Sequence, residues 1–270
     1  MTTLTNDGLF AVAERLGVQT LPVALAVAPQ HDSYDEWRDA QQEAVAALTA
    51  AGIFDSYGDV SPELAQTLFA LTQPERELVV RVFRTAEDPD EPAVVVRATL
   101  ALRGNDHAFA VRTGDEFDVQ AVWSDGSGDS LARPLLGVLG SCAAAEITEF
   151  SAHSQELSER LNEATTAADY ADACFALGVQ GREATVLGLA FETCHAYAEI
   201  VAYDHDEGIT TRAPGAIAVY DTGRGRIVVT PGSAPDLTSW STVTPGTDQR
   251  IAQAISALIE LLPGGRWLRQ

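Results

Sequence analysis

The sequence predicts an α+β fold with a central, twisted antiparallel β-sheet and flanking helical bundles. Several short segments alternate apolar and polar residues and follow one another through short turns, as the strands of antiparallel hairpins do. Segments with a helical apolar period are grouped before and after these strands instead of alternating with single strands, which argues against a parallel sheet. A hairpin followed by an apolar helix occurs twice. We therefore expect one compact domain with helices packed against one face of the sheet.

The two hairpin-and-helix units resemble each other. Residues 108–111 (Ala-Phe-Ala-Val) precede a Thr-Gly turn, a strand and a helix, and residues 216–219 (Ala-Ile-Ala-Val) precede the same succession. The match is short, but the repeated order of elements after it favours an internal duplication. The prediction is a single domain over residues 1–270, with pseudo-repeat halves of about 1–145 and 146–270 related by a pseudo-two-fold axis.

The first half begins with helices and continues with strands. Gly17 ends an opening helix, Ser33 to Glu36 has the pattern of a capping box, and Ser61-Pro62 begins a further helix. The predicted helices are residues 9–16, 34–51, 62–73 and 130–145, and the predicted strands are 21–28, 77–83, 94–102, 107–112 and 117–123.

The second half repeats this order. Short Gly, Asp and Ser turns separate its helices, and Pro263 follows its last one. The predicted helices are residues 154–164, 169–177, 183–190 and 247–262, and the predicted strands are 193–203, 209–212, 215–220, 226–230 and 240–243.

The charge of the chain restricts its partners. Seventeen basic residues, all of them Arg, face 39 acidic ones, giving a formal net charge of −22. A field of this sign opposes binding to nucleic acid and to anionic membranes. No apolar stretch is long enough to cross a membrane, and residues 1–7 lack the basic region of a secretion signal, so we expect a cytoplasmic protein. The three cysteines, Cys142, Cys174 and Cys194, are expected to be small buried apolar residues.

The sequence contains no recognisable catalytic, metal or cofactor motif. The neighbours Cys194 and His195 diverge on a strand or a helix, so they do not form a thiolate–imidazole pair. Residues 204–208 (Asp-His-Asp-Glu-Gly) are typical of a hairpin turn, because the distant bidentate Glu of a calcium loop is missing. Gly223-Arg224-Gly225 lacks the spacing and the Lys of a phosphate-binding loop. We expect no enzyme, no cofactor and no metal.

The C-terminal half carries two longer motifs, Asp221–Arg226 (Asp-Thr-Gly-Arg-Gly-Arg) and Trp240–Thr247 (Trp-Ser-Thr-Val-Thr-Pro-Gly-Thr). Both resemble the EspG family, the cytosolic chaperones of actinobacterial type VII (ESX) secretion. In the first half, Ala51–Ile53, Ser61–Ala65 and Leu71–Leu78 are similar to the helix–loop–helix that leads into the second strand of the family. The resemblance covers most of the chain.

The resemblance implies a chaperone that binds the apolar tip of a PE–PPE heterodimer through its PPE chain, keeps it soluble and targets it to an ESX system. In the family, the central sheet, the loop between its second and third strands and C-terminal helices make the contacts. Here the loop corresponds to residues 84–92 and the last helix to 247–262. The expected partner-binding residues are the loop carboxylates Glu87, Asp88, Asp90 and Glu91. The free protein is expected to be a monomer or a weak homodimer.

Two alternatives to the chaperone remain open at the level of sequence. One is a non-chaperone adaptor or structural protein of the same fold. The other is an uncharacterised enzyme, which a cavity with convergent titratable groups would support.

Overall fold

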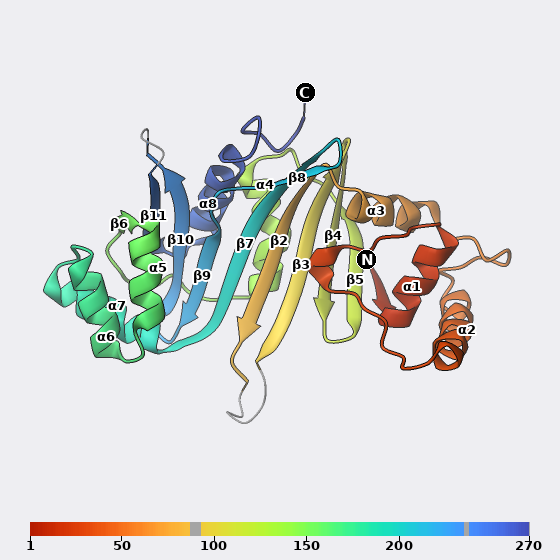
Figure 1. Cartoon of the computed structure of the whole chain (residues 1–270), viewed down its shortest axis with the longest axis horizontal. Helices are drawn as coiled ribbons and strands as arrows, with labels where there is room; N and C mark the ends of the chain where they lie inside the picture. The colour runs from red at the N-terminus through yellow and green to blue at the C-terminus, as the bar shows by residue number, and fades with distance from the viewer. Residues whose placement is uncertain (87–92, 235–237, 270) are drawn as a thin grey trace.

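The computed structural model describes residues 1–86, 93–234 and 238–269, which form a broad antiparallel sheet with helices on both faces (Figure 1). This part of the chain contains eight α-helices and an eleven-stranded sheet, and the predicted α+β class is confirmed. The strands are β1 (Thr2–Thr5), β2 (Arg76–Arg84), β3 (Val94–Arg103), β4 (Asp106–Thr113), β5 (Glu116–Val122), β6 (Phe150–His153), β7 (Cys194–Asp206), β8 (Ile209–Arg212), β9 (Ile217–Thr222), β10 (Gly225–Ser233) and β11 (Ser239–Pro245). The helices are α1 (Asn6–Arg15), α2 (Tyr34–Ala50), α3 (Pro62–Thr72), α4 (Gly128–Leu139), α5 (Ser154–Glu163), α6 (Ala167–Ala176), α7 (Gly181–Glu192) and α8 (Asp248–Glu260), with a 3₁₀ turn, η1 (Val23–Leu25).

The order of strands in the sheet is symmetric about its centre. The path is β1-β5-β4-β3-β2-β7-β9-β10-β11-β6, with β8 paired to β7 off this path. The first half of the chain forms β1 to β5 and the second forms β6 to β11, so the two halves meet where β2 pairs with β7, from Arg76 opposite Asp204 to Arg84 opposite Ala196. Each half begins with a short edge strand and three helices. The central strand and its neighbours follow, and a helix ends each half.

The two similar tetrapeptides that suggested the repeat do not lie in equivalent strands. Residues 108–111 lie in β4, the third strand from the centre of the sheet, whereas residues 216–219 lead into β9, the second strand from the centre on the other side. The strand in the position of β4 is β10. The repeated order of elements therefore exists in the fold, but this short match is not evidence for it.

The helices cover both faces of the sheet, so the expectation that they pack against one face is wrong. Helices α4 and α8 pack together on one face, over the buried side chains of Leu78, Val80 and Val82 in β2. On the opposite face, α1 to α3 cover β3 to β5, and α5 to α7 cover the strands of the second half (Figure 1). The reason lies in the strands: β3 and β4 carry small apolar residues on both faces, and each face must be shielded from water.

Two predicted element assignments differ from the structure, and two edge strands were missed. Residues 21–28 form no strand; they contain the η1 turn, and only Leu25 of that turn is buried. The helix predicted to reach residue 145 ends at Leu139, because Gly140 has a φ of 81° and the next residues run alongside β10. The edge strands β1 and β6 were not predicted, because four-residue strands are too short to show a period.

Candidate partner-binding surface

The middle of the sheet is bare on one face. Helices α1 to α3 and α5 to α7 stand at the two ends of this face, and in the described ranges no helix lies over β2 and β7 between them (Figure 1). We call this region the open face. Strand side chains alternate between faces, so the side chains opposite to buried Leu78 and Val80 of β2 point into it. The open face consists of half-buried side chains of four neighbouring strands: Glu77, Val79, Arg81, Phe83, Val95, Arg97, Tyr197, Glu199, Tyr203, Ala218 and Tyr220.

A row of aromatic rings crosses the open face toward the second helical group. Phe83 of β2 stacks on Tyr197 of β7 with ring centroids 6.1 Å apart, and Tyr197 lies 5.1 Å from Tyr220 of β9. Phe191 of α7 meets the edge of Tyr220 at 5.3 Å. A tyrosine hydroxyl is neutral near pH 7, and burial raises the pKa of both Tyr197 and Tyr220 further. Rigid, uncharged aromatic rings of this kind are the usual anchors of protein interfaces.

A pocket extends the aromatic row beneath α5. Its volume is about 650 Å³, and it lies between α5 and the strands β9 to β11. Leu157 and Leu161 of α5 form one wall, and Tyr197 and Tyr220 belong both to the pocket and to the open face. Serine hydroxyls and small residues make up much of the remaining lining. The surface therefore offers a continuous apolar strip with a hollow at one end, which suits protruding apolar side chains of another protein.

Charged side chains border this strip on the β2 and β7 side. Arg81 and Glu199 lie directly opposite each other on these strands and form an ion pair at 3.0 Å. Arg212 lies 3.9 Å from the same carboxylate. Glu77 accepts a hydrogen bond from Thr99 at 3.1 Å and lies 3.3 Å from the His205 ring. These groups contact one another rather than a shared cavity.

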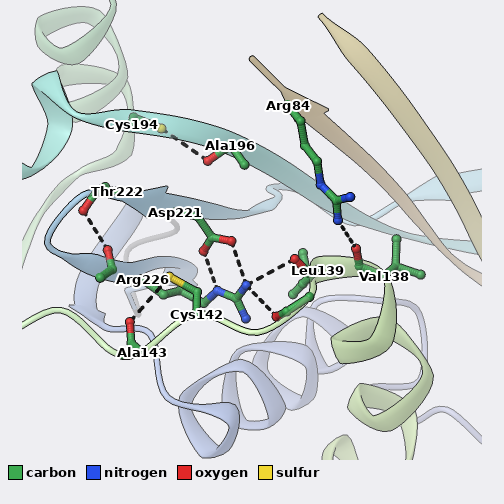
Figure 2. A network of polar contacts seen from close by, with 12 residues as sticks. Arg84, Val138, Leu139, Cys142, Ala143, Cys194, Ala196, Asp221, Thr222 and Arg226 are labelled. Carbon is green, nitrogen blue, oxygen red and sulfur yellow. Dashed lines mark hydrogen bonds and ion pairs between the residues drawn. The ribbon is translucent and has the colours of Figure 1, made fainter. Parts of the chain in front are cut away.

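The Asp221–Arg226 motif forms a buried ion pair. Asp221 in β9 and Arg226 in β10 are cross-strand neighbours, and both carboxylate oxygens accept hydrogen bonds from the guanidinium, at 2.6 and 2.8 Å (Figure 2). The guanidinium also donates to the carbonyl oxygens of Leu139 and Gly140. Arg226 is 1% exposed. The motif thus fixes the end of α4 against the sheet.

Two glycines allow close packing around Arg226. A Cβ on Gly246 would overlap the Arg226 side chain, and a Cβ on Gly225 would lie 2.7 Å from the carbonyl oxygen of Ala143. Thr247, which follows, caps α8 by accepting a hydrogen bond from the backbone of Arg250. The motif residues therefore maintain the fold and do not line the open face.

The four carboxylates predicted to bind a partner, Glu87, Asp88, Asp90 and Glu91, lie outside the described residues. The segment that holds them joins β2 to β3, beyond the pair Arg84 and Val94. The expectation that the last helix forms a receiving surface is wrong, because its apolar side chains Ile251, Ile255, Leu258 and Leu262 are buried against the face opposite to the open one. The aromatic row was missed, because its rings come from strands and helices far apart in the sequence.

The remaining candidate groups have structural partners. Cys194 donates to the carbonyl oxygen of Ala196, and burial raises the pKa of its thiol (Figure 2). Burial raises the pKa of Cys174 to about 11. Of the Asp204–Gly208 segment, only Glu207 and Gly208 form the turn between β7 and β8, and Asp204 lies in β7 and pairs with Arg76 at 2.9 Å. Over the residues that the structure describes, no three His, Cys, Asp or Glu side chains are grouped as metal ligands, and no helix is long and apolar enough to cross a membrane.

Comparisons with known proteins identify relatives along the whole chain. The model of the EspG family matches residues 5–257. The chain is 32% identical to the ESX-1 secretion-associated protein EspG1 of Mycobacterium tuberculosis, over 98% of this chain and 88% of the relative. It is 26% identical to the ESX-3 secretion-associated protein EspG3 of Mycolicibacterium smegmatis, with the same coverage of both chains. A solved structure of the M. tuberculosis type VII secretion system chaperone EspG5, in complex with a PE25–PPE41 dimer, has a similar fold: the TM-score is 0.79, with 19% identity over 98% of each chain.

Proposed function

This chain belongs to the EspG family, and from this premise we propose that it is a cytosolic chaperone for a PE–PPE heterodimer, which it keeps soluble and targets to a type VII secretion system. The observation that carries the proposal is the open face, a strip of aromatic and aliphatic side chains left bare between two groups of helices. Exposed apolar strips of this kind mark sites where another protein binds. The EspG5 neighbour, whose fold is similar, was solved with a PE25–PPE41 dimer.

We propose that the apolar tip of the PPE chain occupies the open face and the α5 pocket. The family resemblance implies an apolar tip on the PPE chain of an elongated helical dimer, and an exposed apolar patch promotes aggregation until it is covered. Phe83, Tyr197 and Tyr220 would supply the anchors, because they are rigid, half-buried and uncharged. The role is binding rather than catalysis: the titratable groups of this surface pair with one another and do not converge on a cavity.

The direct test is co-expression with PE–PPE pairs followed by size-exclusion chromatography. We expect a 1:1:1 complex with a cognate pair. Replacing Phe83 by Ser should weaken this complex by about 2 kcal/mol, mostly through faster dissociation, because a central aromatic anchor is removed. Surface plasmon resonance with the immobilised heterodimer measures both rates.

The matched control is Tyr34→Ser, which removes an aromatic ring that is 70% exposed on α2, far from the open face. Its binding should equal that of the unmodified chain. A folded protein that forms no complex with any PE–PPE pair of the source organism would overturn the chaperone proposal and leave an adaptor of the same fold in its place.

We further propose that Glu87, Asp88, Asp90 and Glu91 form a charged rim beside the open face. They connect two central strands of this surface. Charges at the rim of an interface act mainly on the association rate and on partner choice. Neutralising all four to Gln and Asn should therefore slow association and blur discrimination among PE–PPE pairs while the dissociation rate changes little. The effect should shrink as salt is raised from low to high concentration.

A control with the same change in net charge separates local from global electrostatics. It neutralises four exposed acids of the first half, at Asp32, Asp39, Glu43 and Glu116. Equal slowing by both sets of substitutions would show that net charge, and not the rim, controls association.

A further inference from the structure

We propose that Arg97 and Arg81 form an anion clamp on the open face, which binds a carboxylate side chain on the docking tip of the partner. This inference rests on the proposed function and adds the chemistry of the recognised group. In the register of the sheet, Arg81 of β2 lies directly opposite Arg97 of β3, and Arg97 lies directly opposite Arg112 of β4. Three arginines thus stand side by side on adjacent strands and on the same face. Like charges placed directly opposite each other destabilise a sheet.

Two of these arginines have partners within the protein. Arg81 pairs with Glu199 at 3.0 Å. Arg112 donates to the carbonyl oxygens of Leu25, Ala26 and Gly114, lies over the Phe117 ring at 5.3 Å and approaches Asp115 at 3.9 Å. Arg112 is therefore fixed at the border of the open face by the η1 turn and its own hairpin.

Arg97 has no such partner. It makes no hydrogen bond, ion pair or ring contact within residues 1–86, 93–234 and 238–269. The chain carries 39 acidic residues, yet the described ones leave this half-buried guanidinium unpaired. Its rigid fork of five N–H donors matches the two oxygens of a carboxylate. A carboxylate bound there would also relieve the repulsion between neighbouring arginines.

The local charge has the opposite sign to that of the whole protein. Arg81 and Arg212 share one carboxylate, Glu199, and Arg97 adds an unpaired positive charge beside Arg81, in a chain with a formal net charge of −22. This field repels nucleic acids and other extended polyanions at long range, but a single carboxylate beside apolar side chains is tolerated. Val95 and Phe83 lie next to the clamp on the same face. The recognised group is therefore an Asp or Glu adjacent to the apolar anchors of the tip.

The test uses a PE–PPE pair that forms a complex with the unmodified chain. Arg97→Gln should weaken binding by about 30-fold, and Arg97→Glu by more, because docking removes water from the charge pair. The loss should be smaller at high salt. Reversing one acidic residue of the PPE tip to Arg should restore binding by Arg97→Glu and should weaken binding by the unmodified chain. Arg133→Gln, at an exposed residue of α4 on the opposite side of the sheet, is the matched control and should bind normally.

Folding is followed separately by thermal unfolding. Arg97→Gln should have an unchanged or slightly raised Tm, since it relieves repulsion and breaks no contact. Normal binding by both Arg97 variants, with the unmodified chain bound tightly, would overturn the clamp and leave the proposed function intact. Failure of the unmodified chain to bind any pair would overturn both.

Discussion

Replacing Asp221 by Ala is expected to lower the free energy of unfolding by about 3–5 kcal/mol, because it leaves the Arg226 guanidinium buried without its counter-charge. The guanidinium is 1% exposed, and the carboxylate supplies two of its hydrogen bonds. The carbonyl oxygens of Leu139 and Gly140 remain as acceptors, but neither carries a negative charge. In a chain of this size the loss corresponds to a Tm lower by roughly 10 °C. Chemical unfolding monitored by circular dichroism measures it.

An exposed ion pair gives the comparison. Glu149 and Arg250 lie 2.7 Å apart with both side chains more than 40% exposed, and Glu149→Ala should cost less than about 1 kcal/mol. A cost for Asp221→Ala as small as that for Glu149→Ala would contradict the structural role of the Asp221–Arg226 motif. At a temperature where Asp221→Ala stays folded, it should bind a PE–PPE pair normally, because the motif lies outside the open face.

Replacing Trp267 by Ala is expected to destabilise the fold by about 3–5 kcal/mol. Trp267 follows α8 and is 2% exposed, and its indole N–H donates to Nε2 of His107 in β4 at 3.0 Å. The contact fastens the end of the second half to a strand of the first. Arg269, two residues later, pairs with Asp204 and Asp206. The control is Trp123→Ala, at a tryptophan that is 71% exposed, which should change the Tm by little.

The same contact makes stability depend on pH. The indole N–H can only donate, so Nε2 of His107 must be unprotonated to accept it. Burial lowers the pKa of the His107 imidazole, although a hydrogen bond with the backbone of Asn105 and the charge of Asp106 act in the opposite direction. The unfolded chain therefore takes up this proton at a higher pH than the folded one. The contribution of His107 to stability is complete above its ordinary pKa of about 6.5 and is lost as the pH falls toward the lower folded value.

A variant isolates the contribution of this one group. In His107→Gln the amide oxygen can still accept the indole N–H, but the side chain no longer titrates. The Tm of the unmodified chain should fall more steeply between pH 6.5 and 5 than that of His107→Gln. Parallel curves would show that other groups control the acid response.

The sequence determined the class of fold and the family. The alternation of Leu78, Val80 and Val82, the helix caps at Ser33 and Ser61 and the period of the last helix are local signals, and each was sufficient to predict its element. The resemblance of Asp221–Arg226 and Trp240–Thr247 to the EspG family is confirmed. The division into pseudo-repeat halves at about residue 145 stays a prediction, as does the binding role of Glu87 to Glu91.

Only the tertiary structure decided which surface is free to bind. An amphipathic strand or helix shows from its sequence that it has an apolar face, but not what covers that face. The apolar face of α8 was predicted to receive a partner and is instead covered by the sheet, whereas Phe83, Tyr197 and Tyr220, from three separate strands, stay only half-buried. The row of Arg81, Arg97 and Arg112 exists because β2, β3 and β4 pair in one register, and a shift of one residue would turn their side chains to opposite faces. Local periods are set by neighbours along the chain, but a binding surface is set by contacts between residues far apart in it.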